Sequence, residues 1–326
     1  MSKHLIAAVQ ASPVFMDRKA RTEKVCDLIG AAAKGGAGIV VLPESVIPGY
    51  PDWVWVTPPG VRKPLLDEMY ATLLDNAVTV SDDTTAALGK ASKAAGVHVA
   101  VGVTERNEEA SGASLFNTLL FFGPDGELLQ RHRKLMPTGA ERLVWAQGDG
   151  STLEVYDTPL GKLGGLICWE NYMPLARQSL YGRGLQILAS PTWDSSDMWL
   201  ASMQHIARES GAYVVGCCTA LRMDEIPERF EFRTLYPERE WINRGNSVIC
   251  DPRGKIVAGP VAEKEEILYA EVDPAVSKAS KWIFDAAGHY ARPDVFHLSV
   301  NRRHNPILSD AEADDATGPA PWAETD

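Results

Sequence analysis

Short apolar segments alternate with an amphipathic one at the start of the chain. Residues 4–9 and 38–42 are almost entirely apolar, which predicts two buried strands. Between them, residues 18–34 place apolar side chains at helical spacing, and Gly35 and Gly36 supply the usual stop signal. A strand, a helix and a second strand in this order predict a sheet with helices on its faces.

Turn signals divide the rest of the chain into hairpins and further strand–helix units. Two segments, 123–126 and 251–254, have the Pro, Asp and Gly content typical of tight turns between paired strands. Because hairpins add antiparallel strands to parallel ones, two α/β layers joined in one sandwich fit better than a single doubly wound sheet. The pattern predicts helices at 81–95, 175–182 and 199–210, and strands at 97–103, 114–122, 127–133, 152–158, 163–167, 185–190, 213–218, 246–250, 255–258 and 267–272.

Composition and charge narrow the classes of function. The 326 residues are 45% hydrophobic and 23% charged, which is ordinary for a folded globular protein. The net charge of −11 argues against nucleic acid or an anionic membrane surface as a partner, because both require basic patches. There is no apolar run of about 18 residues, as a membrane span requires, and the N-terminus is a poor signal peptide. We therefore expect a cytoplasmic protein.

The cysteine count bears on redox state and metal binding. The five cysteines, an odd number, cannot all pair, and a disulfide framework is improbable in a large chain rich in core residues. They show no C-x-x-C spacing, and the histidines show no H-x-x-x-H spacing, so a metal site is not expected. The chain is thus expected to carry reduced thiols, of which one could be reactive.

Cys168 is the candidate reactive thiol. It follows the predicted strand 163–167 and precedes a predicted helix, so it lies at an elbow where backbone N–H groups favour a thiolate. A buried structural cysteine is the alternative, and position alone does not separate the two interpretations. For Cys26, Cys217, Cys218 and Cys250, within a helix or strands, the structural interpretation is preferred.

Three other ionisable residues could act beside such a thiol. Glu44 directly follows the strand 38–42 and is a candidate general base. Lys134 follows a strand and could stabilise a developing anion, and Glu141 could supply a second carboxylate. Taken singly, each could equally be a solvated surface residue.

Taken together, these residues lie in four short sequence blocks. The blocks are L-P-E at 42–44, H-R-K-L-M-P-T at 132–138, G-A-E-R at 139–142 and C-W-E-N at 168–171. Over about residues 4–305 the chain resembles the carbon–nitrogen hydrolase superfamily, and within it the nitrilase branch. The resemblance implies an α/β fold, a four-layer α-β-β-α sandwich of the nitrilase type. It also implies a catalytic triad of Glu44, Lys134 and Cys168, with Glu141 as the second glutamate.

Further blocks favour the nitrilase branch, namely P-G-Y-P at 48–51, Q-G-D-G-S at 147–151 and G-H-Y-A-R-P-D at 288–294. One departure is Ala146, where nitrilases usually carry glycine. The resemblance places Tyr50 and Trp193 near the substrate and the Trp169 backbone N–H at the developing charge, and His132 is expected to support the lysine loop or to contact the substrate.

The expected activity is hydrolysis of an organic nitrile to the carboxylic acid and ammonia through a thioimidate and a thioester, with an amide as by-product. An amidase or carbamoylase of the same superfamily and a cyanide-degrading nitrilase are the alternatives. A non-catalytic binding protein on this fold is a further alternative, against which the intact triad argues. The substrate is expected to be a small molecule, and no metal or organic cofactor is implied.

The resemblance also implies a homo-oligomer, either a dimer or a spiral assembly. The segment 223–241 is longer than an ordinary connection, and we expect it to form subunit contacts or to cover the site. The chain is expected to divide into one hydrolase domain, 1–305, and an acidic, flexible C-terminal tail, 306–326.

Overall fold

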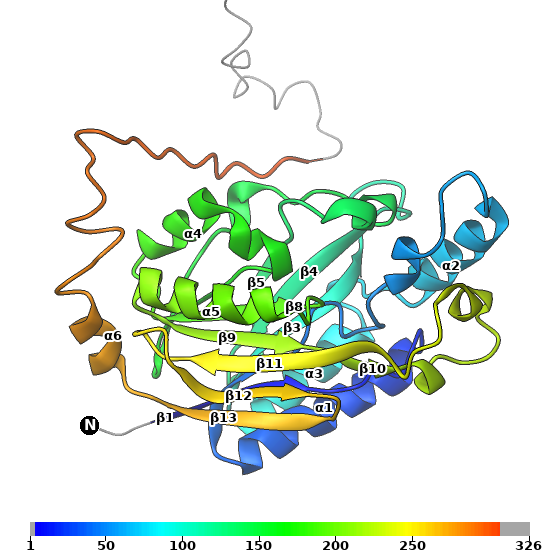
Figure 1. Ribbon diagram of the computed structural model, residues 1–326, viewed down its shortest axis with the longest axis horizontal. Helices are drawn as coiled ribbons and strands as arrows, with labels where there is room; N and C mark the ends of the chain where they lie inside the picture. The colour runs from blue at the N-terminus through cyan, green and yellow to red at the C-terminus, as the bar shows by residue number, and fades with distance from the viewer. Residues whose placement is uncertain (1–3, 307–326) are drawn as a thin grey trace, which may run out of the picture.

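The computed structural model describes residues 4–306 and has two mixed β-sheets packed face to face, with helices on the outer faces (Figure 1). The first sheet has the strand order β13-β1-β2-β3-β4-β5, with parallel pairing in β1-β2-β3 and antiparallel pairing elsewhere. Its strands are β1 (His4–Gln10), β2 (Ala37–Val41), β3 (His98–Arg106), β4 (Leu115–Phe122), β5 (Leu128–Arg133) and β13 (Glu266–Val272).

The second sheet follows the same plan. Its order is β10-β11-β9-β8-β7-β6, with β12 also paired to β11, and only β7-β8-β9 are parallel. Its strands are β6 (Tyr156–Thr158), β7 (Gly161–Gly165), β8 (Ile187–Thr192), β9 (Tyr213–Cys218), β10 (Ala220–Arg222), β11 (Trp241–Cys250) and β12 (Ile256–Ala262).

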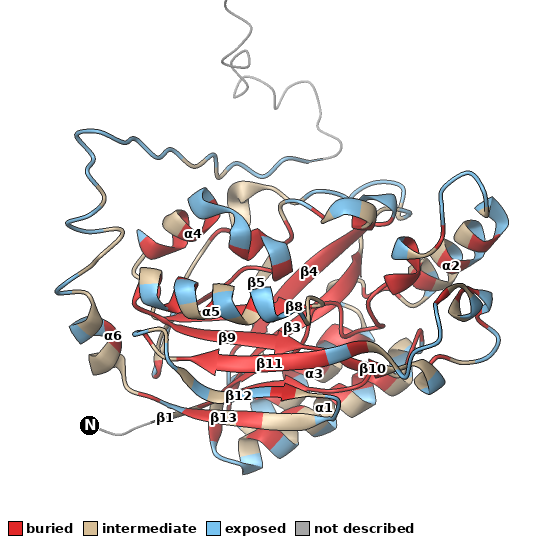
Figure 2. Ribbon diagram, viewed as in Figure 1, coloured by how far each residue is buried: buried red, intermediate tan, exposed pale blue. Residues whose placement is uncertain are grey.

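Alternation along the strands builds the layers. Ile6 and Ala8 of β1 face the second sheet, whereas Ala7 and Val9 pack against the helices α1 (Arg18–Lys34) and α3 (Asp83–Ala95). On the other side, α4 (Pro174–Tyr181) and α5 (Asp197–Ser210) cover the second sheet. The central strands, such as β3, β4, β8 and β9, are therefore buried on both faces (Figure 2), and the predicted four-layer α-β-β-α sandwich is confirmed.

Local signals set several helix boundaries. Helix α1 begins after Asp17, whose carboxylate accepts a hydrogen bond from the Ala20 N–H, and it ends at Gly35 as predicted. Helix α3 ends at Gly96, whose φ of 67° lies in the left-handed region that glycine adopts readily. The four cysteines that were interpreted as structural lie on α1, β9 and β11, and all five cysteines are free thiols.

Several elements differ from the prediction. The predicted strand 152–158 is paired only over Tyr156–Thr158, because Asp149 caps a short 3₁₀-helix at Gly150–Thr152. Strand β11 begins at Trp241 rather than at 246, since its first half pairs with β10, a strand that was not predicted. The helices α2 (Lys63–Asp75) and α6 (Pro274–Ser280) were not predicted either.

Two further expectations concern the whole chain. Apart from residue 306, the predicted acidic tail lies outside the described residues. Within 4–306, no helix is long and apolar enough to cross a membrane.

Candidate active site

Glu44 is placed by a tight turn after β2. The turn passes so close to β3 that a Cβ at Gly102 would lie 2.4 Å from the Pro43 carbonyl oxygen and 2.8 Å from the Glu44 Cα. Ser45, the next residue, has a φ of 45°, and its hydroxyl is 2.8 Å from that of Thr104 on β3. Glu44 is fully buried. A glycine on the neighbouring strand therefore allows a carboxylate to be held inside the sandwich.

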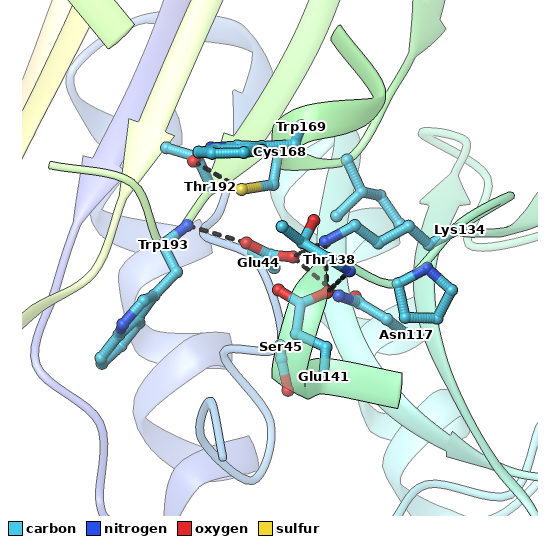
Figure 3. Close-up of polar contacts among 12 residues, drawn as sticks. Glu44, Ser45, Asn117, Lys134, Thr138, Glu141, Cys168, Trp169, Thr192 and Trp193 are labelled. Carbon is cyan, nitrogen blue, oxygen red and sulfur yellow. Dashed lines mark hydrogen bonds and ion pairs between the residues drawn. The ribbon is translucent and has the colours of Figure 1, made fainter. Parts of the chain in front are cut away.

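Lys134 lies just beyond β5, and its side chain links two carboxylates. Its Nζ donates to Glu44 Oε1 and to Glu141 Oε2, both at 2.8 Å, as Figure 3 shows. The ammonium group is completely buried, so these contacts replace the water that a lysine normally keeps. The structure thus brings together three of the residues predicted from separate sequence blocks.

Cys168 lies at the elbow between β7 and the 3₁₀-helix Cys168–Tyr172, with a φ of 52°. Figure 3 shows its Sγ on the Glu44 side of the cluster, and the charges of both Glu44 and Lys134 act on the thiol. The Thr192 hydroxyl donates to Sγ at 3.2 Å and accepts the Asp194 N–H at 2.9 Å. The first N–H groups of a helix have no partner within it, and Cys168 and Trp169 are the first two residues of this one.

The charges in the site determine its protonation. Burial raises the pKa of Glu44, although Lys134 partly offsets the effect. Burial also raises the pKa of the Cys168 thiol, and the charge of Glu44 raises it further. Despite its burial, Lys134 has a raised pKa, because the charges of Glu44 and Glu141 favour the ammonium form. The thiol is therefore protonated in the resting site and needs a base, for which Glu44 is placed.

Additional donors orient the two carboxylates. Glu44 Oε1 accepts a second bond from Asn117 Nδ2, and its Oε2 accepts one from the Trp193 backbone N–H, each at 2.7 Å. Glu141 is the third residue of a 3₁₀-helix, Gly139–Leu143, and its Oε2 caps the Thr138 N–H at 2.7 Å. The methyl group of Ala146 is exposed, so this departure from the family pattern does not press on Glu141.

Aromatic side chains line one side of this cluster. Tyr50 stacks on Trp193 with ring centroids 4.4 Å apart and an interplanar angle of 7°, and its hydroxyl donates to Glu141 Oε1 at 2.7 Å. The Trp55 indole is half exposed and donates to the Tyr50 oxygen, whereas Trp53 is core. The Trp169 indole is also half exposed, with its Nε1–H bonded to Asp194.

His132 lies apart from these aromatic side chains. It is buried, with Nδ1 at 2.9 Å from the Thr152 hydroxyl and Nε2 at 3.1 Å from Glu170 Oε2. Glu170 in turn accepts the Leu135 N–H through Oε1 and the Ile167 N–H through Oε2, each at 2.7 Å. Both ring nitrogens of His132 are therefore occupied by protein groups, which fits support of the lysine loop and not contact with a substrate.

Sequence reasoning missed Asn117, Thr192 and Glu170. A polar Asn in the apolar run 115–122 was the available signal for the first, because a buried amide needs partners. Thr192 is a polar residue at the end of a buried strand. Glu44 was identified because it follows such a strand, and the same position in the sequence could have identified Thr192. Among the described residues there is no group of three or more His, Cys, Asp or Glu side chains suited to a metal ion.

Comparison with known proteins bears on this arrangement. Residues 5–281 match the carbon–nitrogen hydrolase family. The chain is 43% identical to an aliphatic nitrilase of Sinorhizobium fredii (strain HH103) over 92% of this chain and 96% of that protein. It is 39% identical to nitrilase 1 of Arabidopsis thaliana, over 91% and 86% of the two chains. A bifunctional nitrilase/nitrile hydratase of Nicotiana tabacum, NIT4B, is 40% identical over 90% and 84%.

Solved structures share the fold. The NitFhit protein of C. elegans superposes with a TM-score of 0.71 at 19% identity, covering 94% of this chain and 69% of that one. Nit3 of Saccharomyces cerevisiae, a member of branch 10 of the nitrilase superfamily, gives 0.63 at 22%, over 88% and 96%. At these identities the likeness is one of architecture.

The position of Glu170 generates a prediction about stability. Replacement by alanine leaves the buried Ile167 N–H, the partly buried Leu135 N–H and the His132 ring without their acceptor, each at a cost of about 1–3 kcal/mol. We expect Glu170→Ala to lower the free energy of unfolding by roughly 3 kcal/mol or more, measured by urea denaturation. Glu225→Ala, which removes a single bond to the Arg222 N–H at a partly buried turn, is the matched control. Equal losses in the two variants would contradict the role assigned to Glu170.

Proposed function

The chain belongs to the carbon–nitrogen hydrolase family, and from this membership we propose that it is a nitrilase, which hydrolyses an organic nitrile to the carboxylic acid and ammonia. One observation carries the proposal. Lys134 is buried between Glu44 and Glu141 beside the Cys168 elbow, in a chain 39–43% identical to named nitrilases over more than nine-tenths of its length. Glu44, Lys134 and Cys168 are proposed as the catalytic triad.

The first half of the reaction forms a covalent intermediate. Cys168 Sγ attacks the nitrile carbon while its proton passes to Glu44, and that proton then moves to the nitrogen, which gives a thioimidate. Lys134 and the Trp169 N–H are proposed to stabilise negative charge on the substrate, and removing one such donor typically costs about 10²–10³ in rate. A general base is required here because the resting thiol is protonated.

The second half consumes two water molecules. Glu44 takes a proton from the first water, which adds to the thioimidate carbon to form a tetrahedral intermediate. Loss of ammonia from this intermediate gives a thioester, and a second water then releases the carboxylic acid and restores the thiol. If the tetrahedral intermediate expels the thiol instead, the product is an amide.

The stacked aromatic rings of Tyr50 and Trp193 support a small, partly apolar substrate. Tyr50 and Trp193 are proposed to line the substrate site, because their stacked rings lie next to the two carboxylates. The alternatives remain an amidase or carbamoylase activity and cyanide degradation. No contact in the described residues favours either of them over nitrile hydrolysis.

We also propose a compartment, a domain organisation and self-association for the enzyme. Five free thiols, one of them the proposed nucleophile, support a reducing compartment such as the cytoplasm. A shared core between the two sheets supports a single domain over 1–305. Exposed large apolar side chains, among them Leu175, Trp282 and Phe296, support self-association.

Activity on a substrate panel tests the proposal. We expect ammonia release from organic nitriles, and we expect Cys168→Ala to abolish it without changing the circular dichroism spectrum. After brief exposure to a slowly turned-over nitrile, mass spectrometry of the digested protein should place the acyl group on Cys168, with Cys217 as an internal control. Turnover of amides or of cyanide alone, or an active Cys168→Ala variant, would contradict the proposal.

The raised pKa of Glu44 generates a pH prediction. A base must be ionised, so kcat/KM should fall as the pH is lowered through this pKa, above its ordinary value of 4.5. The measurement is the pH profile of kcat/KM, with the fold followed by circular dichroism at each pH. A limb at or below the ordinary value, with the fold intact, would argue against Glu44 as the base.

Self-association has its own test. Light scattering coupled to size-exclusion chromatography should give a mass at least twice that of the 35.5 kDa chain. We expect Trp282→Arg to lower this mass, because a charge at an 80% exposed indole opposes apolar contact between copies. A wild-type monomer would contradict the oligomer proposal and leave the chemistry of the site unaffected.

A further inference from the structure

Asp52 is a buried carboxylate outside the proposed triad. It lies at the start of the 3₁₀-helix Asp52–Trp55, two residues after Tyr50. Its Oδ1 accepts the Trp193 indole Nε1–H at 2.8 Å, and its Oδ2 accepts the Tyr236 hydroxyl. Burial raises the pKa of Asp52, while the hydrogen bond from Tyr236 opposes this effect. Both oxygens are committed to protein donors, so Asp52 is not placed to bind a substrate.

Trp193 connects Asp52 to the reacting groups. Its ring is held at the nitrogen by Asp52 and across its face by Tyr50, and its carbonyl oxygen accepts from Asn243 on β11. Its backbone N–H donates to Glu44 Oε2 (Figure 3). Trp193 is thus held at both its ring and its peptide group, which fixes its orientation. The backbone N–H that Glu44 accepts is therefore held in one direction.

Tyr236 belongs to the long connection 223–241. Phe230, Phe232 and Tyr236 of this connection pack into one apolar cluster with Tyr50, and residues of α2 complete the cluster. Figure 1 shows the connection beside α2, at one end of the molecule. The guanidinium of Arg239 lies 4.9 Å from the centre of the Tyr236 ring. In the described part of the chain, the hydrogen bond from Tyr236 to Asp52 therefore links the connection to the site.

We propose that Asp52, held by Tyr236, is a positioning residue that fixes Trp193 and through it the orientation of Glu44 toward Cys168. The connection 223–241 thereby acts on the chemical step through Tyr236 and Asp52. A misplacement of about 1 Å in a reacting group can cost roughly 10² in rate, so loss of this support should appear in kcat.

The test compares steady-state kinetics of four variants on a nitrile that the wild type hydrolyses, with the melting temperature measured for each. Tyr236→Phe removes one hydroxyl, and Asp52→Ala removes the carboxylate. Asp52→Asn keeps an oxygen for the Trp193 indole and offers an amide to the Tyr236 oxygen. Tyr181→Phe is the matched control, because the buried Tyr181 on α4 donates in the same way to Glu209 at 2.7 Å, in the outer helix layer.

We expect kcat to fall about tenfold in Tyr236→Phe and about a hundredfold in Asp52→Ala, with KM changed less than roughly threefold. Asp52→Asn should recover most of the activity that alanine loses, and Tyr181→Phe should keep wild-type kcat. If Asp52→Ala does not fold, Tyr236→Phe carries the test.

Three results would overturn the inference: wild-type kcat in Tyr236→Phe, a loss no larger than that in Tyr181→Phe, or a change confined to KM. The inference rests on the proposed nitrile hydrolysis, and the two fail differently. A wild type inert toward nitriles contradicts the proposed function, whereas an active wild type with an unaffected Tyr236→Phe variant contradicts only the role of Asp52.

Discussion

The rest of the structure depends on keeping one ammonium and two carboxylates out of water. Burying charged groups is costly unless each is paired and hydrogen-bonded, and Lys134, Glu44 and Glu141 satisfy this condition only together. As a cluster they carry a net negative charge, which disfavours a second anion at Cys168. The same burial that makes the site costly thus also raises the pKa of the nucleophile, which explains why a base is needed beside it.

The sandwich meets this constraint by bringing strand ends from both sheets to one place. Glu44 and Lys134 follow strands of the first sheet, whereas Cys168 and Thr192 belong to the second. The carboxyl ends of parallel strands are where open α/β sheets place functional groups, and here two such sheets face each other. The carboxylate of Glu170 accepts hydrogen bonds from the backbone N–H groups of Leu135, next to Lys134, and of Ile167, next to Cys168. It therefore links the two segments that carry these residues.

Sequence could predict the parts of this arrangement that are local. Apolar runs, glycine stops and turn residues located most strands and helices, and the order of the blocks located the proposed triad. Helix α2 was missed because its last residue, Asp75, is followed by Asn76 and not by a glycine. Asp52 and Tyr236 were missed for another reason. They are 184 residues apart, and only the folded chain shows that the Tyr236 hydroxyl donates a hydrogen bond to the Asp52 carboxylate. The role of His132 likewise depends on a contact with Glu170 across the sheet interface.

The division of the site between two sheets has a consequence for protein engineering. The distance from nucleophile to base is set by how one sheet registers on the other, and that registration depends on the apolar layer between them, which includes Leu119, Ile187 and Val215. Close-packed interiors transmit strain, so repacking this layer would change the rate even though none of these side chains needs to touch a substrate. Selecting for turnover in a library of such variants would therefore also select for the alignment of the two sheets.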